Sequence, residues 1–165
     1  MLFRSLYAVG YFGVYEPTDA RVVQTMTALR DRLWCKTPVG GIARYENDYY
    51  HQVSHDVANV PGNPWFICTL WIAQWLIKKA TTMEQLKEAV PLMEWVADRC
   101  LPSGVLAEQV HPHSNEPLSV SPLTWSHATF VQVVLDYLEK RTSLDRCATC
   151  HHPAHPFRTR KTNKP

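Results

Sequence analysis

The sequence contains little charge of either sign, and no apolar run reaches the length of a membrane-spanning helix. Only 19% of its 165 residues are charged, and the formal net charge is +2. Four basic residues lie close to the C-terminus: Arg158, Arg160, Lys161 and Lys164. Without them the net charge falls by four, to −2. Because nucleic acids and anionic membranes bind to basic faces, we expect neither as a partner.

The sequence shows no spaced disulfide framework, and we expect no secretion signal. Its five cysteines are an odd number, and Cys35, Cys68 and Cys100 lie within expected helices or at their ends. The N-terminal segment combines Arg4 with an apolar run, but no small-residue cleavage site follows before the turn at residues 16–17. We therefore expect reduced thiols and a cytoplasmic location.

Two segments in the first half have the character of helices. One stripe of apolar residues follows the i, i+4, i+7, i+11 spacing of a helix face: Val22, Met26, Leu29 and Leu33. Asp19 is a suitable cap, so the pattern predicts an amphipathic helix over residues 19–35. Residues 64–80 are apolar over much of their surface and begin with Pro64, a residue suited to the first helical position. Such a helix is normally enclosed by other helices.

Two further helices are expected in the second half. Capping-box spacing over residues 81–84 starts the third helix, and Pro91 must kink or split it. Its expected buried residues are Leu86, Val90, Met93 and Val96. The fourth helix is expected to have Ser121 as its cap and to run from Pro122 to about Arg141. Its expected buried stripe is Leu123, Phe130, Val131, Val134, Leu135 and Leu138.

No strand pattern and no short-period repeat interrupts this series, so the sequence predicts an all-α fold. Short connections alternate with two long loops, over residues 44–64 and 101–122. Long loops in compact domains are often functional. We therefore expect the chemistry of this protein to lie in these two loops.

The second loop carries Glu108, a carboxylate among apolar neighbours. Burial in such a place raises a pKa or positions a base, but a loop carboxylate is also often a cap or half of an ion pair. The first loop carries Arg44 and Asp48, which can hydrogen-bond to sugar hydroxyls, together with Tyr49 and Trp65, whose rings can cover the apolar face of a pyranose. The same aromatic residues can also be ordinary packing residues. The residues alone leave these alternatives open.

Two groups of motifs in these loops resemble those of glycoside hydrolase family 15, which contains the glucoamylases. The first is Arg-Tyr-Glu-Asn-Asp-Tyr-Tyr at residues 44–50, followed by Gly-Asn-Pro-Trp-Phe at residues 62–66. The second is Ala-Glu-Gln at residues 107–109, followed by Glu-Pro-Leu-Ser at residues 116–119 and Leu-Thr-Trp-Ser at residues 123–126. The resemblance extends over about residues 10–141.

The resemblance implies a toroid of six helical hairpins, with the catalytic pocket in the loops at one end. It also implies hydrolysis of α-glucosidic bonds in oligo- or polysaccharides with inversion, without a cofactor and with Glu108 as the general base. Arg44 is expected to bind sugar hydroxyls, and Tyr49 and Trp65 to line the subsites around the scissile bond. Trp125 is expected to close the pocket beside the base. Three more residues are expected to hold these side chains in place: Tyr45, Asp48 and Gln109.

The sequence departs from the family pattern in two places. Residues 51–61 resemble an insertion beside the pocket, which can be a lid, an extra subsite or a surface loop. No motif for the family's general acid precedes Arg44, and the expected helices are too few to close the toroid. We therefore expect residues 1–141 to be the C-terminal portion of the catalytic domain, in a truncated product or in a split protein completed by the N-terminal half. The alternative is a non-catalytic carbohydrate-binding or regulatory module with the same fold.

Residues 142–165 form a basic tail rich in Cys, His and Pro that we expect to be disordered. Four of its residues have spacing that suits zinc: Cys147, Cys150, His151 and His155. Cys-Ala-Thr-Cys-His also matches the haem-attachment pattern, although haem attachment is not expected without an export signal. A metal-binding protein with a helical scaffold is thus a third possibility, beside an incidental tail.

Overall fold

The computed structural model describes residues 4–146, so the four tail residues considered as metal ligands lie outside the described part. A short 3₁₀ helix, η1 (Arg4–Tyr7), continues into α1 (Ala8–Tyr11). The longer helices are α2 (Ala20–Leu33), α3 (Phe66–Lys79) and α6 (Thr124–Leu144), and two shorter ones, α4 (Met83–Lys87) and α5 (Val90–Ala97), lie between the last two. A small antiparallel hairpin pairs β1 (Gln109–Val110) with β2 (Pro117–Leu118).

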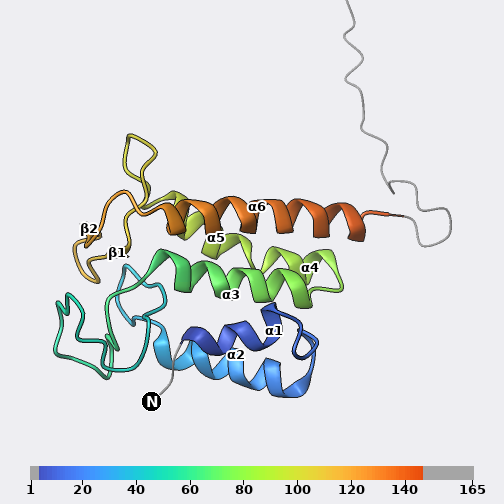
Figure 1. The fold of residues 1–165 in the computed structure, drawn as a ribbon, viewed down its shortest axis with the longest axis horizontal. Helices are drawn as coiled ribbons and strands as arrows, with labels where there is room; N and C mark the ends of the chain where they lie inside the picture. Colours follow the sequence, from blue (N-terminus) through green and yellow to red (C-terminus); the bar gives the residue numbers. More distant parts are fainter. Residues whose placement is uncertain (1–3, 147–165) are drawn as a thin grey trace, which may run out of the picture.

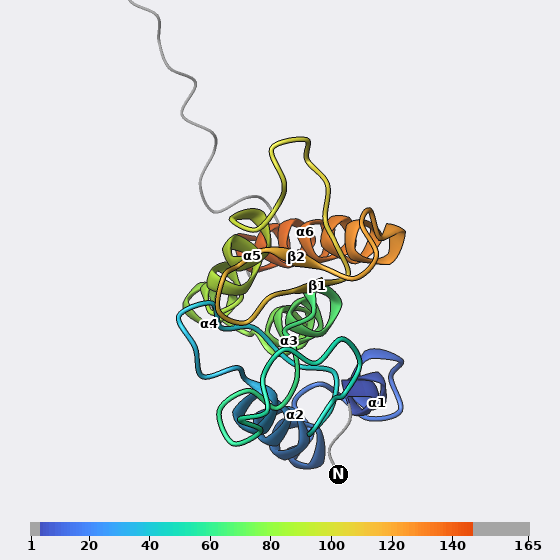
Figure 2. The same cartoon turned by 90° about the vertical axis from the view of Figure 1, so that its left-hand side faces the viewer.

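The helices form two curved layers. Seen along the helices, α1, α3 and α6 follow one another in one layer, and α2, α4 and α5 lie in the other (Figure 2). Helix α3 is in the middle, and nearly all of its residues are buried. This confirms the expectation that residues 64–80 contain an enclosed helix. Among the described residues, no helix is both long and apolar enough to span a bilayer.

The expected stripe of α2 is confirmed, because its buried residues are Val22, Met26, Leu29 and Leu33. Asp19 is its N-cap and accepts a hydrogen bond from the backbone N–H of Arg21 at 2.9 Å. Both features depend on residues within one helix, which is why sequence periodicity predicts them well.

The expected helix starts are less accurate. Residues Pro64 and Trp65 are extended rather than helical, because Pro64 pairs with Ala43 and the Trp65 N–H donates to the Ile42 carbonyl at 2.9 Å. Helix α3 therefore begins at Phe66. Helix α6 likewise begins two residues after Pro122 and extends to Leu144, past the expected end at Arg141.

The third expected helix is split at Pro91, as predicted, into α4 and α5. The cap is Thr82, which accepts from the Gln85 N–H at 3.3 Å, so the capping position is one residue later than expected. Leu86 and Val96 are buried as predicted, whereas Val90 and Met93 are only half-buried.

The expected buried stripe of α6 is right only in part, since Leu123, Phe130 and Val134 are half-buried. The residues of α6 that are buried are Ser126, Thr129 and Val133. Three members of the expected stripe are exposed instead: Val131, Leu135 and Leu138. The helix makes its most extensive contacts with α3, and it also contacts α4 and α5. The sequence predicted no strands, whereas the structure contains the short hairpin β1–β2. The fold is otherwise helical, as predicted.

Candidate active site

The two long loops lie at the same end of the helices, on the left in Figure 1. Short extended segments join them: Trp34 pairs with Ile42, Ala43 with Pro64, and Trp65 with Gln109. The Val110 N–H donates to the Pro64 carbonyl at 2.9 Å. This ladder places the chain around Arg44, the start of α3 and the chain around Glu108 next to one another. The candidate site is built on it.

Arg44 and Asp48 form a two-point ion pair. The Arg44 Nε lies 2.9 Å from Asp48 Oδ2, and its Nη2 lies 2.8 Å from Asp48 Oδ1. The Asp48 side chain is fully buried and the Arg44 side chain is 21% exposed. Burial lowers the pKa of Arg44, but the hydrogen bonds and the charge of Asp48 outweigh it, so the pKa is raised overall. The guanidinium group is therefore charged and fixed in orientation.

Three aromatic rings surround this guanidinium group. Its Cζ atom lies 4.8 Å from the ring centroid of Trp65, 4.9 Å from that of Tyr45 and 5.0 Å from that of Tyr50. A cation at these distances interacts favourably with aromatic faces. The predicted residues Arg44, Tyr45, Asp48 and Trp65 thus lie together.

Tyr50, which the sequence interpretation did not select, lies closer to this site than Tyr49 does. The Tyr50 ring centroid is 6.3 Å from that of Trp65, whereas Tyr49 as a residue is 77% exposed. The backbone N–H of Tyr50 also donates to Asp48 Oδ1 at 3.1 Å. The motif at residues 44–50 contains both tyrosines, and nothing in its spacing distinguishes Tyr50 from Tyr49.

Glu108 is half-buried and held by two side chains. The Ser119 hydroxyl and the Gln109 amide both donate to its Oε2 atom, the latter at 3.3 Å. Ser119 has a φ of 63°, a left-handed conformation that is uncommon for serine. The sequence interpretation missed Ser119 as a contact of Glu108. The hairpin makes the contact, since β1 and β2 bring the two residues into adjacent positions.

The side chain of Asn63 is hydrogen-bonded to both long loops. Its Nδ2 atom donates to Gln109 Oε1 at 2.9 Å and to the His51 carbonyl at 2.7 Å. Asn63 and Gln109 are both buried. Asn63 was not predicted as a site residue, whereas the expected place of Gln109 beside Glu108 agrees with this geometry.

The segment 51–61 is anchored at both ends. His51 is bonded to Asn63 as described, the Lys36 N–H donates to the Asn59 carbonyl at 2.8 Å, and the Asp48 N–H donates to the Pro61 carbonyl at 2.9 Å. These contacts tie the segment to the end of α2 and to the ion pair. Its role as lid, subsite or surface loop stays open.

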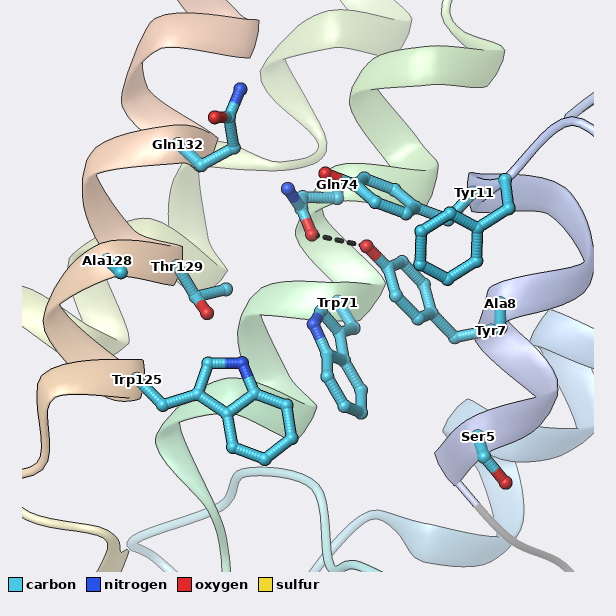
Figure 3. Close-up of a pocket in the computed structure, with 11 residues that line it drawn as sticks. Ser5, Tyr7, Ala8, Tyr11, Trp71, Gln74, Trp125, Ala128, Thr129 and Gln132 are labelled. Atoms are coloured by element: carbon cyan, nitrogen blue, oxygen red, sulfur yellow. Dashed lines mark hydrogen bonds between the residues drawn. The ribbon is translucent and has the colours of Figure 1, made fainter.

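Trp125 lies in the first turn of α6 and is 48% exposed. Its ring meets that of Trp71 at an angle, with the centroids 5.6 Å apart (Figure 3). Both rings line a groove of about 470 Å³ between η1, α1, α3 and α6. The expected place of Trp125 beside Glu108 remains a prediction.

Within residues 4–146, no cluster of three or more His, Cys, Asp or Glu side chains is arranged to hold a metal ion. The zinc and haem interpretations concern residues beyond that part of the chain.

The structure is thus a curved double layer of helices with a carboxylate, an arginine–aspartate pair and aromatic rings gathered at one end. Its family follows from comparison with known proteins. The chain belongs to glycosyl hydrolases family 15, whose family model matches residues 4–96, more than half of the sequence. Glu108 lies beyond the matched residues, so its role has to be argued from its surroundings.

The chain spans about a fifth to a third of the length of the three similar proteins that follow. An uncharacterized glycosyl hydrolase of Methanocaldococcus jannaschii is 29% identical over 142 residues, which are 80% of this chain and 21% of that protein. A bacterial glucoamylase, solved in complex with acarbose, matches with a TM-score of 0.70 and 24% identity over 84% of this chain and 20% of its own. Hormoconis resinae glucoamylase matches with a TM-score of 0.62 and 18% identity, over 84% and 32%. The fold is thus part of a glucoamylase α/α toroid, as predicted.

Proposed function

We propose that this chain contributes to the hydrolysis of α-glucosidic bonds with inversion, and that Glu108 is the general base. The observation that carries the proposal is the way in which Glu108 is held. Both side-chain hydrogen bonds that the described residues make to it go to Oε2, so Oε1 is the oxygen that would take the proton of the attacking water. A carboxylate fixed in this way keeps its water in line with the sugar.

The proposed sugar site is the surface formed by Arg44, Tyr50 and Trp65. The guanidinium group offers directional hydrogen bonds to vicinal hydroxyls, and the rings offer flat apolar faces to a pyranose. The distance of 3.5 Å between the Tyr50 hydroxyl and Ser119 Oγ links this surface to the base. The acarbose complex of the similar bacterial glucoamylase supports an oligosaccharide as the substrate class.

Inverting hydrolysis also needs a general acid, at roughly 6.5–9.5 Å from the base. The chain spans 21% of the length of the M. jannaschii relative, and we propose that the acid belongs to the part of the catalytic domain outside this sequence. The 165-residue chain alone is then expected to bind a malto-oligosaccharide without hydrolysing it.

Binding of maltotriose to the chain, followed by tryptophan fluorescence or NMR, tests the sugar site. We expect Tyr50→Ala to weaken binding at least tenfold, because its ring contacts both Arg44 and Trp65. Tyr49→Ala is the matched control and is expected to change binding less than twofold, since its side chain points into solvent. The reverse order of effects, or no binding at all, would contradict the proposed site.

Hydrolysis is tested by mixing the chain with the M. jannaschii relative from which the aligned segment has been deleted. We expect release of glucose, first as the β-anomer in a proton NMR time course, and loss of this activity in Glu108→Gln. Glu116→Gln is the control. Glu116 is an exposed carboxylate next to the same hairpin, and it accepts a hydrogen bond from the Ser114 hydroxyl. Equal activity of the Glu108→Gln variant and the wild type excludes Glu108 as the base. Sugar binding without Glu108-dependent hydrolysis favours the non-catalytic module.

A further inference from the structure

We propose that His127 is a positioning residue for Glu108. It acts as a neutral imidazole whose Nε2 atom accepts a hydrogen bond from the backbone two residues before that carboxylate. The inference deepens the proposed function, because it rests on Glu108 as the base. His127 is half-buried in the first turn of α6, and the sequence interpretation did not select it.

The contact fixes which ring nitrogen of His127 carries the proton. The backbone N–H of Leu106 can only donate, and its nitrogen lies 3.0 Å from the Nε2 atom of His127. Nε2 must therefore have a free lone pair, so the single ring proton of the neutral imidazole is on Nδ1. Leu106 is 3% exposed, and a buried N–H that loses its acceptor is destabilising. The imidazole therefore serves this fold as an acceptor and not as a cation.

The start of α6 holds the same segment at two further points. The Leu123 N–H donates to the Leu106 carbonyl at 3.0 Å. The Ser126 hydroxyl, in a fully buried residue, donates to the Ala107 carbonyl at 2.8 Å. The two residues before Glu108 are thus fastened to the start of α6, which lies at the same end of the molecule as the hairpin β1–β2 (Figure 1).

Glu108 is held from the hairpin side as well. Its backbone N–H donates to the Val120 carbonyl at 2.8 Å, and its Oε2 atom accepts the two side-chain hydrogen bonds described above. His127 and Ser126 are the side chains that hold the preceding segment from the α6 side. A displacement of about 1 Å in catalytic geometry can lower a rate by about a hundredfold, so we expect the base to depend on this fastening.

NMR of the full 165-residue chain, labelled with nitrogen-15, tests the contact directly. We expect the His127 proton on Nδ1 and a coupling through the hydrogen bond between Nε2 and the Leu106 amide nitrogen. His113, an exposed histidine of the second long loop, is the reference in the same spectrum and is expected to show no such coupling. A proton on Nε2 of His127, or the absence of the coupling, overturns the inference.

Two amide variants test whether the contact places Glu108. His127→Gln puts an acceptor oxygen near the position of Nε2, whereas the shorter side chain of His127→Asn puts it near the position of Nδ1. We expect the carboxyl carbon resonance of Glu108 to shift in His127→Asn and to stay close to the wild-type position in His127→Gln. His113→Asn is the matched control and is expected to leave this resonance unchanged. A resonance that His127→Asn does not move, even with a lowered Tm, assigns His127 a purely structural role and overturns the inference.

Activity gives an independent measurement, in the mixture with the M. jannaschii relative that lacks the aligned segment. We expect His127→Asn to lower kcat at least tenfold with KM unchanged, and His127→Gln to remain within threefold of the wild type. Hydrolysis that depends on Glu108 but is unchanged in His127→Asn contradicts only this inference. Hydrolysis that survives Glu108→Gln contradicts the proposed function, and the carboxyl resonance then still decides whether His127 places Glu108.

Discussion

Gly62→Ala tests whether the close contact between residue 62 and Asp48 keeps the Arg44–Asp48 ion pair in place. A Cβ atom at this position lies 2.7 Å from the Cβ of Asp48, whereas ordinary contact begins at about 3.4 Å. The two residues must therefore separate by at least about 0.7 Å. The backbone of Gly62 is not in the left-handed region, so the substitution acts through this clash and not through φ.

The shift acts directly on the ion pair. The hydrogen bonds from Arg44 to Asp48 are 2.9 and 2.8 Å long, and a displacement of 0.7 Å along them exceeds the range of a normal hydrogen bond. Overpacking of this kind costs about 1–3 kcal/mol. For a protein of this size, that corresponds to a decrease in Tm of roughly 3–10 °C.

Thermal unfolding followed by circular dichroism measures the loss of stability, and the NMR resonance of the Arg44 Nε–H reports on the ion pair. Gly104→Ala is the control: it has no atom within 4 Å of the added Cβ but a φ of +83°, so it costs roughly 1–2 kcal/mol through backbone strain alone. We expect both variants to lose stability and only Gly62→Ala to shift the Arg44 resonance. An unchanged Tm and an unchanged resonance in Gly62→Ala would refute the reasoning.

Three further predictions follow from the same geometry. Asp48→Asn leaves the Arg44 charge without its buried partner and is expected to cost about 3–5 kcal/mol in urea unfolding, so a loss below about 1 kcal/mol counts against the pair. Hydrogen bonds from Arg21 lower the pKa of Asp19 from 3.8 to about 2. The ionised Asp19 therefore stabilises the fold above about pH 4, and we expect Asp19→Ala to lower the Tm there but not as the pH falls towards about 2. A Tm difference that does not depend on pH contradicts this. Burial raises the pKa of the Cys35 thiol to about 12, so peptide mapping is expected to find it unmodified by iodoacetamide at pH 8 until the chain is unfolded.

The comparison of α2 with α6 shows what periodicity predicts and what it does not. In α2 the apolar residues form a single stripe, so the buried face is the only apolar face and the prediction is right. In α6 the buried residues include Ser126 and Thr129, while three apolar residues, Val131, Leu135 and Leu138, are exposed. Periodicity finds an apolar face without indicating which neighbour is present to cover it.

The loop residues show a similar limit. Arg44, Asp48, Trp65, Glu108 and Gln109 were selected from their motifs, and they lie together at one end of the helices. The predicted domain boundary at residue 141 and the tail beyond it stay predictions, although α6 continues past that boundary.

The sequence by itself determined the helical class, the position of α2, the split at Pro91 and the two loops in which we propose that the chemistry lies. These depend on caps, prolines and periodicity, which act over a few residues of the chain. Only the tertiary structure decided that Tyr50 rather than Tyr49 lies against Trp65, that Ser119 holds Glu108, and that α3 begins at Phe66. Each of these depends on pairing between segments more than ten residues apart, and such pairing is set by the packing of the whole fold and not by local propensity.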